Sequence, residues 1–123
     1  MKLLILGGTR FLGCHLVTAA LARHHDITLF HRGKHAAVAY TNVEMIYGDR
    51  HRDLAKLHGH RWDAVIDTCG YLPQSVRASA EALADAVEQY TFISSALSNL
   101  NFRVTMHSHP RFTRWNRRGN PNF

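Results

Sequence analysis

Cysteine, long apolar runs and acidic residues near the C-terminal end are scarce or absent in this chain of 123 residues. Its two cysteines, Cys14 and Cys69, show no metal-type spacing, which favours free thiols in a reducing compartment over a disulfide or a zinc site. The first apolar run ends after Leu6, whereas a signal peptide needs roughly 7 to 15 apolar residues and a membrane span about 20. The ten histidines are scattered, and we expect surface positions for them rather than metal ligands. These absences predict a cytoplasmic protein without a membrane segment or a metal site.

Acidic residues stop well before the end of the chain. Residues 1 to 95 carry 10 basic and 9 acidic side chains, whereas residues 96 to 123 carry five arginines and no acid. The formal net charge of +6 therefore comes almost entirely from the last part of the chain. We interpret residues 1 to 95 as a domain and residues 96 to 123 as a basic tail of uncertain structure.

The first thirteen residues carry the most informative pattern. Four large aliphatic residues, Leu3 to Leu6, fit a strand buried on both faces, and Gly7 and Gly8 follow directly. A helix is predicted from Phe11 to about Arg23, because apolar residues recur at helical spacing: Leu12, Leu16, Ala19, Ala20 and Leu21. A glycine turn that joins a strand to a helix N-terminus favours a bound phosphate. We interpret it as a dinucleotide site, with a simple tight turn as the alternative.

The glycines of this turn have separate tasks. Gly7 and Gly8 permit backbone angles that a residue with a Cβ avoids, and they let a phosphate approach the main chain. Gly13 lies one turn into the helix, where it would let the helix pack close against the first strand. The order of strand, glycine turn and amphipathic helix is what gives the motif its meaning.

The second predicted strand, Ile27 to Phe30, ends in His31-Arg32-Gly33-Lys34. In a dinucleotide fold an acid at this end accepts a hydrogen bond from the adenosine 2′-hydroxyl, whereas an arginine accommodates a 2′-phosphate. The acid is absent here, and Arg32 and Lys34 are both cations. We therefore favour NADP, with NAD possible. The alternative is that both cations are solvated loop charges, which leaves the cofactor open.

A third strand is predicted at 42–47 and is followed by Gly48 and Asp49. Asp49 either accepts a hydrogen bond from the adenine amino group or caps the short helix predicted at about 52–58. That helix is expected to direct two leucines inward and to stop at Gly59.

The fourth strand, 63–67, is short and apolar, and it opens into loop 68–71 at its carboxyl end, where ligands bind in open α/β sheets. Asp67 either caps this loop or orients a ligand. A helix follows from Pro73 to about Gln89, marked by a stripe at 3.6-residue spacing: Val76, Ala80, Leu83 and Val87.

A fifth strand at 90–93 is followed by Ser94 and Ser95. Five strands that alternate with helices predict an α/β fold with a parallel sheet, right-handed crossovers and helices on both faces. The loops that follow the strands then gather along one edge of the sheet. An alternating stretch at 102–106 would add an edge strand.

With these residues placed, the chain resembles the NAD(P)-dependent epimerase/dehydratase group of the short-chain dehydrogenase/reductase superfamily over about residues 1 to 95. The motifs that match follow the five strands: Gly7 to Gly13, Arg32-Gly33, Gly48-Asp49, Ile66-Asp67-Thr68 and Phe92-Ile93-Ser94-Ser95. The resemblance implies a partial doubly wound, Rossmann-like sheet of about five strands in the order 3-2-1-4-5. It also implies a cofactor site formed by Gly7, Gly8, Thr9, Arg10, Phe11, Leu12, Gly13, Arg32, Lys34, Asp49, Arg50, Thr68 and Ser94.

The turn departs from the usual family pattern at one position. The family turn reads G-x-x-G-x-x-G, and its middle glycine is Arg10 here. A subgroup with G-G-T-R-F resembles this turn, so cofactor binding remains the expectation, and Arg10 could itself reach the pyrophosphate or the 2′-phosphate. Some relatives with a similar turn are RNA-associated chloroplast proteins.

The catalytic elements of the superfamily are only partly present. Its members carry a Ser or Thr just past the fifth strand and a downstream Tyr-x-x-x-Lys, which together perform acid–base chemistry coupled to hydride transfer. Ser95 matches the first element, but none of the four tyrosines has a lysine four residues on. The resemblance therefore implies the NAD(P)-binding portion of an epimerase, dehydratase or reductase, weakly active or inactive as this chain stands, with an unidentified small-molecule substrate.

The last part of the chain leaves other interpretations open. We hypothesise that residues 96 to 123 depart from the reading frame of the family near Ala96, or that the chain is otherwise truncated. Arginines interleaved with Phe112 and Trp115 could contact RNA, although disordered sequence explains them more simply. A non-enzymatic dinucleotide sensor is a third interpretation. Because an incomplete sheet exposes the edge of its fifth strand, self-association is also expected.

Overall fold

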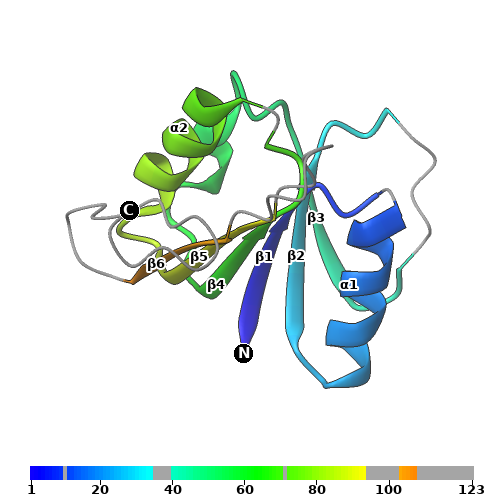
Figure 1. Ribbon diagram of the computed structural model, residues 1–123. Helices are drawn as coiled ribbons and strands as arrows, with labels where there is room; N and C mark the ends of the chain where they lie inside the picture. Colours follow the sequence, from blue (N-terminus) through cyan, green and yellow to red (C-terminus); the bar gives the residue numbers. More distant parts are fainter. Residues whose placement is uncertain (10, 35–39, 71, 94–102, 108–123) are drawn as a thin grey trace.

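The computed structural model describes residues 1–9, 11–34, 40–70, 72–93 and 103–107. Within them lie six strands, two α-helices and one short 3-10 helix (Figure 1). The strands are β1 (Lys2–Leu6), β2 (Asp26–His31), β3 (Val43–Tyr47), β4 (Trp62–Asp67), β5 (Val87–Ile93) and β6 (Arg103–His107). The helices are α1 (Phe11–Ala22), η1 (Leu54–Leu57) and α2 (Pro73–Leu83).

All six strands form one sheet in the order β3-β2-β1-β4-β5-β6. The first five strands are parallel to their neighbours, and β6 is antiparallel to β5. The chain leaves β1 toward β2 on one side and returns to β4 on the other, so the strand order switches direction beside β1. Open α/β sheets bind ligands at such a switch point. The predicted α/β class and strand order 3-2-1-4-5 are confirmed, as is the edge strand predicted near 102–106.

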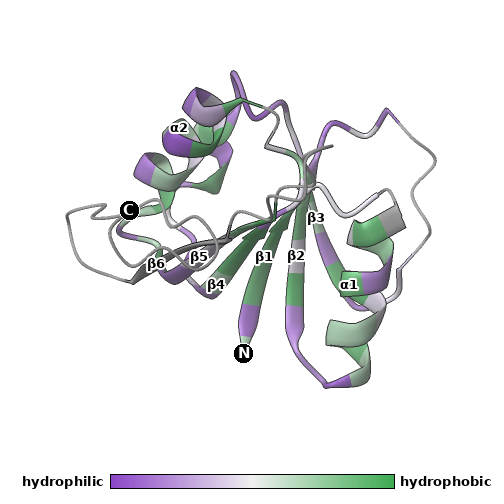
Figure 2. Ribbon diagram, viewed as in Figure 1, coloured by the Kyte–Doolittle hydropathy of each residue, from purple (hydrophilic) through white to green (hydrophobic). Residues whose placement is uncertain are grey.

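The sheet separates two apolar cores, one beneath each helical layer (Figure 2). Side chains of β1 alternate between them: Leu4 and Leu6 belong to the core under α2 and η1, and Leu3 and Ile5 to the core under α1. All four are at most 7% exposed. The unbroken aliphatic run of β1 is therefore explained by helices on both faces, as predicted.

α1 covers close to its predicted range, but its buried face differs from the predicted stripe. Gly13, Val17 and Ala20 are buried, whereas Leu12 is 43% exposed and Ala19 is also exposed. Because the helix is apolar around most of its circumference, the spacing of apolar residues alone does not identify the side that packs on the sheet.

α2 ends earlier than predicted. It stops at Leu83, and residues 87–89, which were predicted as helix, belong to β5. Val87 pairs with Trp62 and Gln89 with Ala64 across the ladder to β4. Val87 nevertheless lies in the same core as the apolar residues of α2, so the helical spacing that continued past Leu83 came from a shared core and not from a longer helix. The short helix predicted at 52–58 is likewise only the 3-10 turn η1.

β5 is not an edge strand, because β6 pairs with it from Gln89↔His107 to Ile93↔Arg103. The exposed fifth strand on which the predicted self-association depended is thus paired. Among the described strands, β3 and β6 form the two edges. In the described part of the chain, no helix has the length and apolar character needed to cross a membrane.

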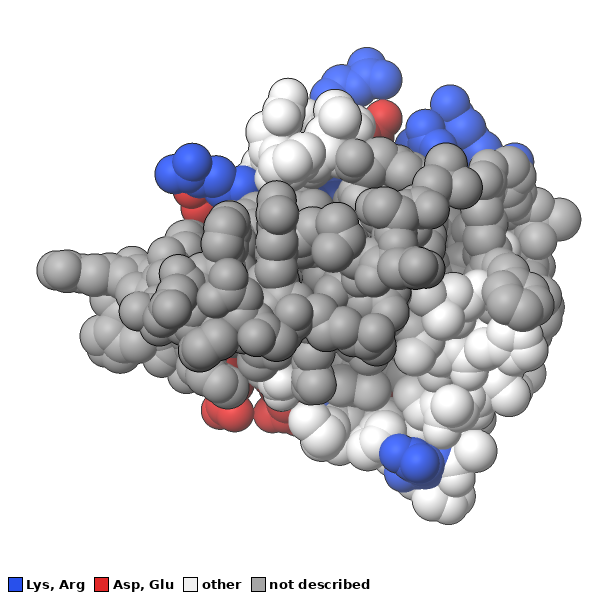
Figure 3. Space-filling model, viewed as in Figure 1, with Lys and Arg blue, Asp and Glu red and all other residues white. Residues whose placement is uncertain are grey.

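On the face drawn in Figure 3, the Lys and Arg side chains that can be seen lie around the margin, in places next to Asp or Glu. Some are paired with opposite charges: Arg77 donates to Glu81 at 2.9 Å along α2, and Arg52 lies 4.0 Å from Asp49. This distribution agrees with the near-neutral balance of residues 1 to 95.

Candidate functional site

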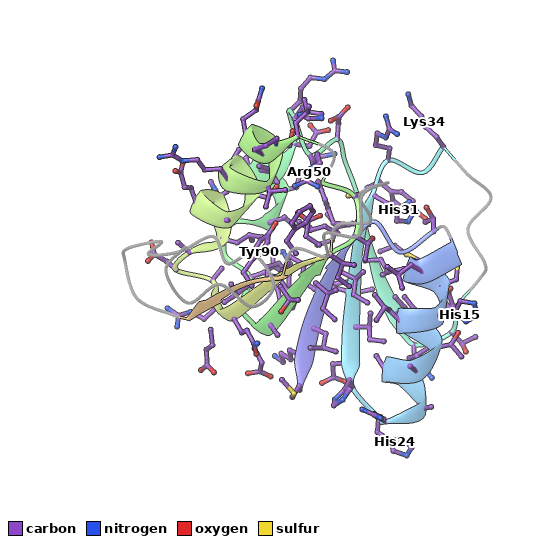
Figure 4. All side chains as sticks on the ribbon, in the orientation of Figure 1. His15, His24, His31, Lys34, Arg50 and Tyr90 are labelled. Carbon is purple, nitrogen blue, oxygen red and sulfur yellow. The ribbon has the colours of Figure 1, made fainter. Side chains whose placement is uncertain are left out.

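A pocket of about 260 Å³ lies where β1, β2, β3 and β4 end. Figure 4 shows His31, Lys34 and Arg50 at this end of the sheet and His24 at the opposite end. Ten residues that the sequence assigned to a cofactor line the pocket: Gly7, Gly8, Thr9, Leu12, Gly13, Arg32, Lys34, Asp49, Arg50 and Thr68. Six that it did not assign also line it: Phe30, His31, Gly33, Gly48, His51 and Cys69.

The glycine turn forms one wall of this pocket. Gly7 and Gly8 have φ values of 99° and 89°, in the left-handed region that favours glycine, and the N–H of Gly7 donates to the carbonyl oxygen of Phe30 at 2.9 Å. A Cβ on Gly13 would collide with the backbone of Gly8, so this glycine lets the start of α1 approach the turn that follows β1. Farther along the helix, Val17 and Ala20 share a core with Leu3 and Ile5 of β1. The first turn of α1 contains no acidic residue. The glycine turn therefore leads into the N-terminus of α1, whose free N–H groups can attract an anion.

The opposite side of the turn is closed by Thr68. Its hydroxyl donates to the carbonyl oxygen of Leu6 at 2.8 Å, and its backbone N–H donates to the same oxygen at 3.0 Å. A Cβ on Gly7 would lie 2.5 Å from the Thr68 hydroxyl oxygen. Thr68 thus holds the end of β4 against the end of β1 and leaves room only for glycine at position 7.

Cations gather where β2 ends. Arg32 and Lys34 are exposed at the lining of the pocket, and neither makes a hydrogen bond or ion pair with another described residue. Asp49 and Arg50 are the other charged residues of the lining, so cations outnumber acids there by three to one. This balance suits an anionic ligand.

His31, the last residue of β2, was not predicted as a site residue. Its side chain is buried, and its Nδ1 accepts a hydrogen bond from the N–H of Gly33 at 3.0 Å. Its Nε2 is buried without a hydrogen-bond partner, and its ring meets that of Tyr47 edge to face at a centroid distance of 5.0 Å. Burial lowers the pKa of His31. The signal in the sequence is its position, since a strand end in a dinucleotide fold commonly carries an acid there.

The carboxylate of Asp49 forms a hydrogen bond within the loop that follows β3. One carboxylate oxygen accepts the backbone N–H of His51 at 2.8 Å, and this hydrogen bond is the main reason that the pKa of Asp49 is lowered. The N-cap of η1 is Asp53, whose carboxylate instead accepts the backbone N–H of Asp49 at 2.7 Å. The prediction that Asp49 caps this helix is therefore wrong, and a contact with adenine stays a prediction.

Arg50 directs both terminal nitrogens of its guanidinium into the protein. They donate to the two carboxylate oxygens of Asp67, each at 2.9 Å, and one of them also donates to the hydroxyl of Ser79 at 2.8 Å and to the carbonyl oxygen of Ser75 at 3.0 Å. Burial works against the charge, but the bonded carboxylate of Asp67 outweighs it and raises the pKa of Arg50. Its Nε is buried without a partner. Arg50 therefore lines the pocket, but its terminal N–H groups form hydrogen bonds with buried residues and not with the pocket.

Asp67 is the acceptor at the centre of this network. It is fully buried, and besides Arg50 it accepts the hydroxyl of Tyr90 at 2.6 Å and the N–H of Cys69 at 3.2 Å. The last bond agrees with capping of the loop after β4, one of the two roles that the sequence left open for Asp67. Burial, followed by the nearby carboxylate, raises the pKa of the Tyr90 hydroxyl.

Cys69 is the last described residue of the lining. Its sulfur accepts a hydrogen bond from Arg50 at 3.3 Å, and burial raises the pKa of its thiol. Cys14 and Cys69 are both free thiols, as predicted. Arg10, Ser94 and Ser95, and the side chain of Phe11, lie outside the described residues. The described residues contain no group of three or more histidine, cysteine or acidic side chains placed to hold a metal.

Comparisons with known proteins agree with this geometry. A sequence model of the NAD dependent epimerase/dehydratase family matches residues 3–106. The chain is 33% identical over 111 residues to the chloroplast stem-loop binding protein of 41 kDa b of Arabidopsis thaliana, in a match that covers 77% of this chain and 29% of that protein. It therefore spans less than a third of that relative.

Solved structures share the fold at lower identity. An epimerase from Methanothermobacter thermautotrophicus has a TM-score of 0.66 at 17% identity, covering 77% of this chain and 35% of that one. The Bordetella bronchiseptica enzyme WbmG, solved in complex with NAD, has a TM-score of 0.64 at 19% identity, covering 79% and 38%. Because the family model spans both the glycine turn and the rest of the pocket, this chain belongs to the NAD dependent epimerase/dehydratase family.

Proposed function

We propose that the pocket binds a nicotinamide dinucleotide, with its diphosphate at the glycine turn and its adenosine end toward Arg32. The observation that carries this proposal is the turn itself: two glycines with positive φ precede a helix that lies so close to Gly8 that only glycine fits at position 13. Such a turn leaves room for phosphate against the main chain, and Arg10 could add a cation to it. Family membership and the NAD bound to a structural relative support the same ligand class.

We further propose that NADP is preferred over NAD. Arg32 and Lys34 lie exposed at the end of β2, where an acid would accept the 2′-hydroxyl of NAD. Asp49, the acid of the described lining, already accepts one backbone N–H and retains capacity for the adenine amino group. Thr68 and Ser94 complete the proposed set of cofactor contacts.

In this proposal the chain binds the cofactor but does not by itself convert a substrate. A nicotinamide dinucleotide supplies hydride exchange when bound. Ser95 is the proposed catalytic residue, and none of the 123 residues provides the Tyr-x-x-x-Lys pair that would exchange a proton with the substrate. We therefore propose that the chain as it stands binds its cofactor with little or no turnover.

The binding test is a titration of NADPH fluorescence with the Gly13→Ala variant. The added Cβ displaces the turn from α1, and loss of about one charge-assisted hydrogen bond should weaken NADPH about tenfold. The matched control is Gly59→Asn, at a position with φ of 83° where asparagine is tolerated and a Cβ meets nothing within 4 Å. Wild-type chain that binds no NADPH at submillimolar concentration would overturn the proposal.

RNA binding is the second candidate, and one comparison favours it. The Arabidopsis relative is named as a stem-loop binding protein, and residues 96 to 123 carry five arginines. The balance of 10 basic and 9 acidic side chains in residues 1 to 95 gives RNA binding by the domain less support. Salt-sensitive RNA binding that survives deletion of residues 96 to 123 would implicate the domain. Binding that is lost on deletion of residues 108 to 123, which leaves β6 in place, would implicate the tail.

A further inference from the structure

Arg50 connects two strands that are not neighbours in the sheet. It lies in the loop that follows β3, yet its guanidinium bonds to Asp67, the last residue of β4. In the strand order β2 and β1 lie between β3 and β4, and neighbouring strands are about 4.8 Å apart. The Arg50–Asp67 pair therefore joins the two sides of the strand-order switch, at the end of the sheet where the pocket lies (Figure 4).

The terminal N–H groups of Arg50 have no capacity left for a ligand. One terminal nitrogen donates to Asp67 at 2.9 Å and to the sulfur of Cys69 at 3.3 Å. The other donates to Asp67 at 2.9 Å, to the Ser79 hydroxyl at 2.8 Å and to the carbonyl oxygen of Ser75 at 3.0 Å. Each of these nitrogens carries only two N–H groups, and Nε is buried. A bound phosphate could recruit Arg50 only by leaving the buried charge of Asp67 unpaired, which is strongly unfavourable.

The same guanidinium holds two of the loops that line the pocket. Residues 48–51 come from the loop after β3, and Thr68 and Cys69 come from the loop after β4. Asp67 accepts the Arg50 donors from the first loop and the backbone N–H of Cys69 at 3.2 Å from the second, so one carboxylate joins both loops. The bonds to the serines attach this guanidinium to α2 as well. The spacing of the two loops is therefore set by Arg50.

We propose that Arg50 is a positioning residue, which fixes the loop after β3 against the loop after β4 and so preorganises the pocket for a dinucleotide that it does not touch. The inference rests on the proposed dinucleotide site. Walls that are ordered before binding improve affinity, because the ligand does not have to order them. Arg50 then acts on the cofactor indirectly, in place of the direct contact expected from the sequence. Among the described cations of the lining, contact with the ligand is left to the exposed Arg32 and Lys34.

The first test needs no ligand. Arg50→Lys keeps a cation beside Asp67 but loses the forked donors, for which lysine is no substitute. Amide hydrogen exchange measured by NMR should become about tenfold faster at Asp49 and Cys69, because the openings of the two loops are no longer opposed by the fork. The control is Ile27→Ala, at the other end of β2 in the core under α1, which also lowers stability but should leave exchange at both amides close to wild type. Equal acceleration in both variants, or none in Arg50→Lys, would overturn the inference.

The second test measures the Kd of NAD⁺ and NADP⁺ by calorimetry. Arg50→Lys should raise both constants by the same factor of about ten, since it disturbs the walls of the pocket and not a contact with one phosphate. Ile27→Ala should bind both cofactors as wild type does. A lysine also binds phosphate, so a direct contact would survive in Arg50→Lys, and unchanged constants would overturn the inference.

The double variant Arg50→Met/Asp67→Asn removes both charges and serves if Arg50→Lys does not fold. It should bind both cofactors more weakly than wild type but with the same dependence on NaCl concentration, because no charge that meets the ligand is lost. A smaller salt dependence would show that Arg50 contacts the ligand and would overturn the inference. If wild type binds neither cofactor, the proposed function fails, and the exchange experiment alone decides whether Arg50 positions the loops.

Discussion

At the scale of single residues, Arg50 joins parts of the chain that are distant in sequence. Its side chain is 9% exposed and that of Asp67 is not exposed at all, so both charged groups are buried. Burial of an ion pair is often close to neutral for stability, but removal of one partner leaves the other charge unpaired. The pair therefore makes the floor of the pocket sensitive to a single substitution.

We expect Arg50→Met to lower the free energy of unfolding by about 3 to 5 kcal/mol, because Asp67 remains buried without its cation. Urea denaturation measures the change. Arg77→Met is the matched control, since Arg77 and Glu81 are exposed by 75% and 51% and such surface pairs contribute about 0.5 kcal/mol or less. The double variant Arg50→Met/Asp67→Asn should be more stable than Arg50→Met alone. Equal urea midpoints for wild type and Arg50→Met would contradict the prediction.

Arg32 provides a test of cofactor choice that does not involve the interior. Arg32→Ala should weaken NADP⁺ about tenfold and leave NAD⁺ nearly unchanged, because in the proposed binding mode Arg32 makes a charge-assisted contact with the 2′-phosphate alone. Calorimetric titration with both cofactors measures the ratio, and Arg77→Ala serves as the control for loss of an exposed arginine far from the pocket. Equal weakening of both cofactors would mean that Arg32 lies near a group that the two share.

At the scale of elements, β6 changes the character of the sheet edge. β5 is parallel to β4 and would be left with unpaired N–H and C=O groups if β6 did not pair with it. Unpaired strand edges recruit other strands. β6 therefore protects β5 from other chains, within the part of the sheet that the structure describes.

Deletion of residues 96 to 123 should consequently produce concentration-dependent association through the edge of β5. Light scattering after size-exclusion chromatography measures it. The control is deletion of residues 108 to 123 alone, which retains β6 and should behave like the full chain. A monomer at high concentration after the longer deletion would show that β5 is protected in another way.

At the scale of the whole molecule, the sequence predicted the sheet better than the side-chain contacts. Alternating strands and helices determine which loops meet, so Gly7, Arg32, Asp49 and Thr68 line one pocket as the topology requires. The orientation of Arg50 could not be predicted in the same way. A loop residue at a sheet edge can turn toward the ligand or toward the interior, and the choice depends on Asp67, Ser79 and Tyr90, which come from other elements.

The end of α2 shows a second limit of sequence patterns. Val87 satisfies the helical spacing because it fills the same core as the helix, although it belongs to a strand. Similarly, the exposed Leu12 and Ala19 show that a helix apolar on most sides has no face that spacing can identify. In both cases burial is decided by packing between elements, which local periodicity does not contain.

Cys69 is the last described residue that lines the pocket. The Arg50–Asp67 pair beneath the pocket nevertheless depends on hydrogen bonds with later residues: Ser75, Ser79 and Tyr90. A chimera that joins this segment to a foreign catalytic half should for that reason cross over after Ile93. A junction between Cys69 and Pro73 would include every described lining residue. It would still remove the residues that hydrogen-bond to the Arg50–Asp67 pair.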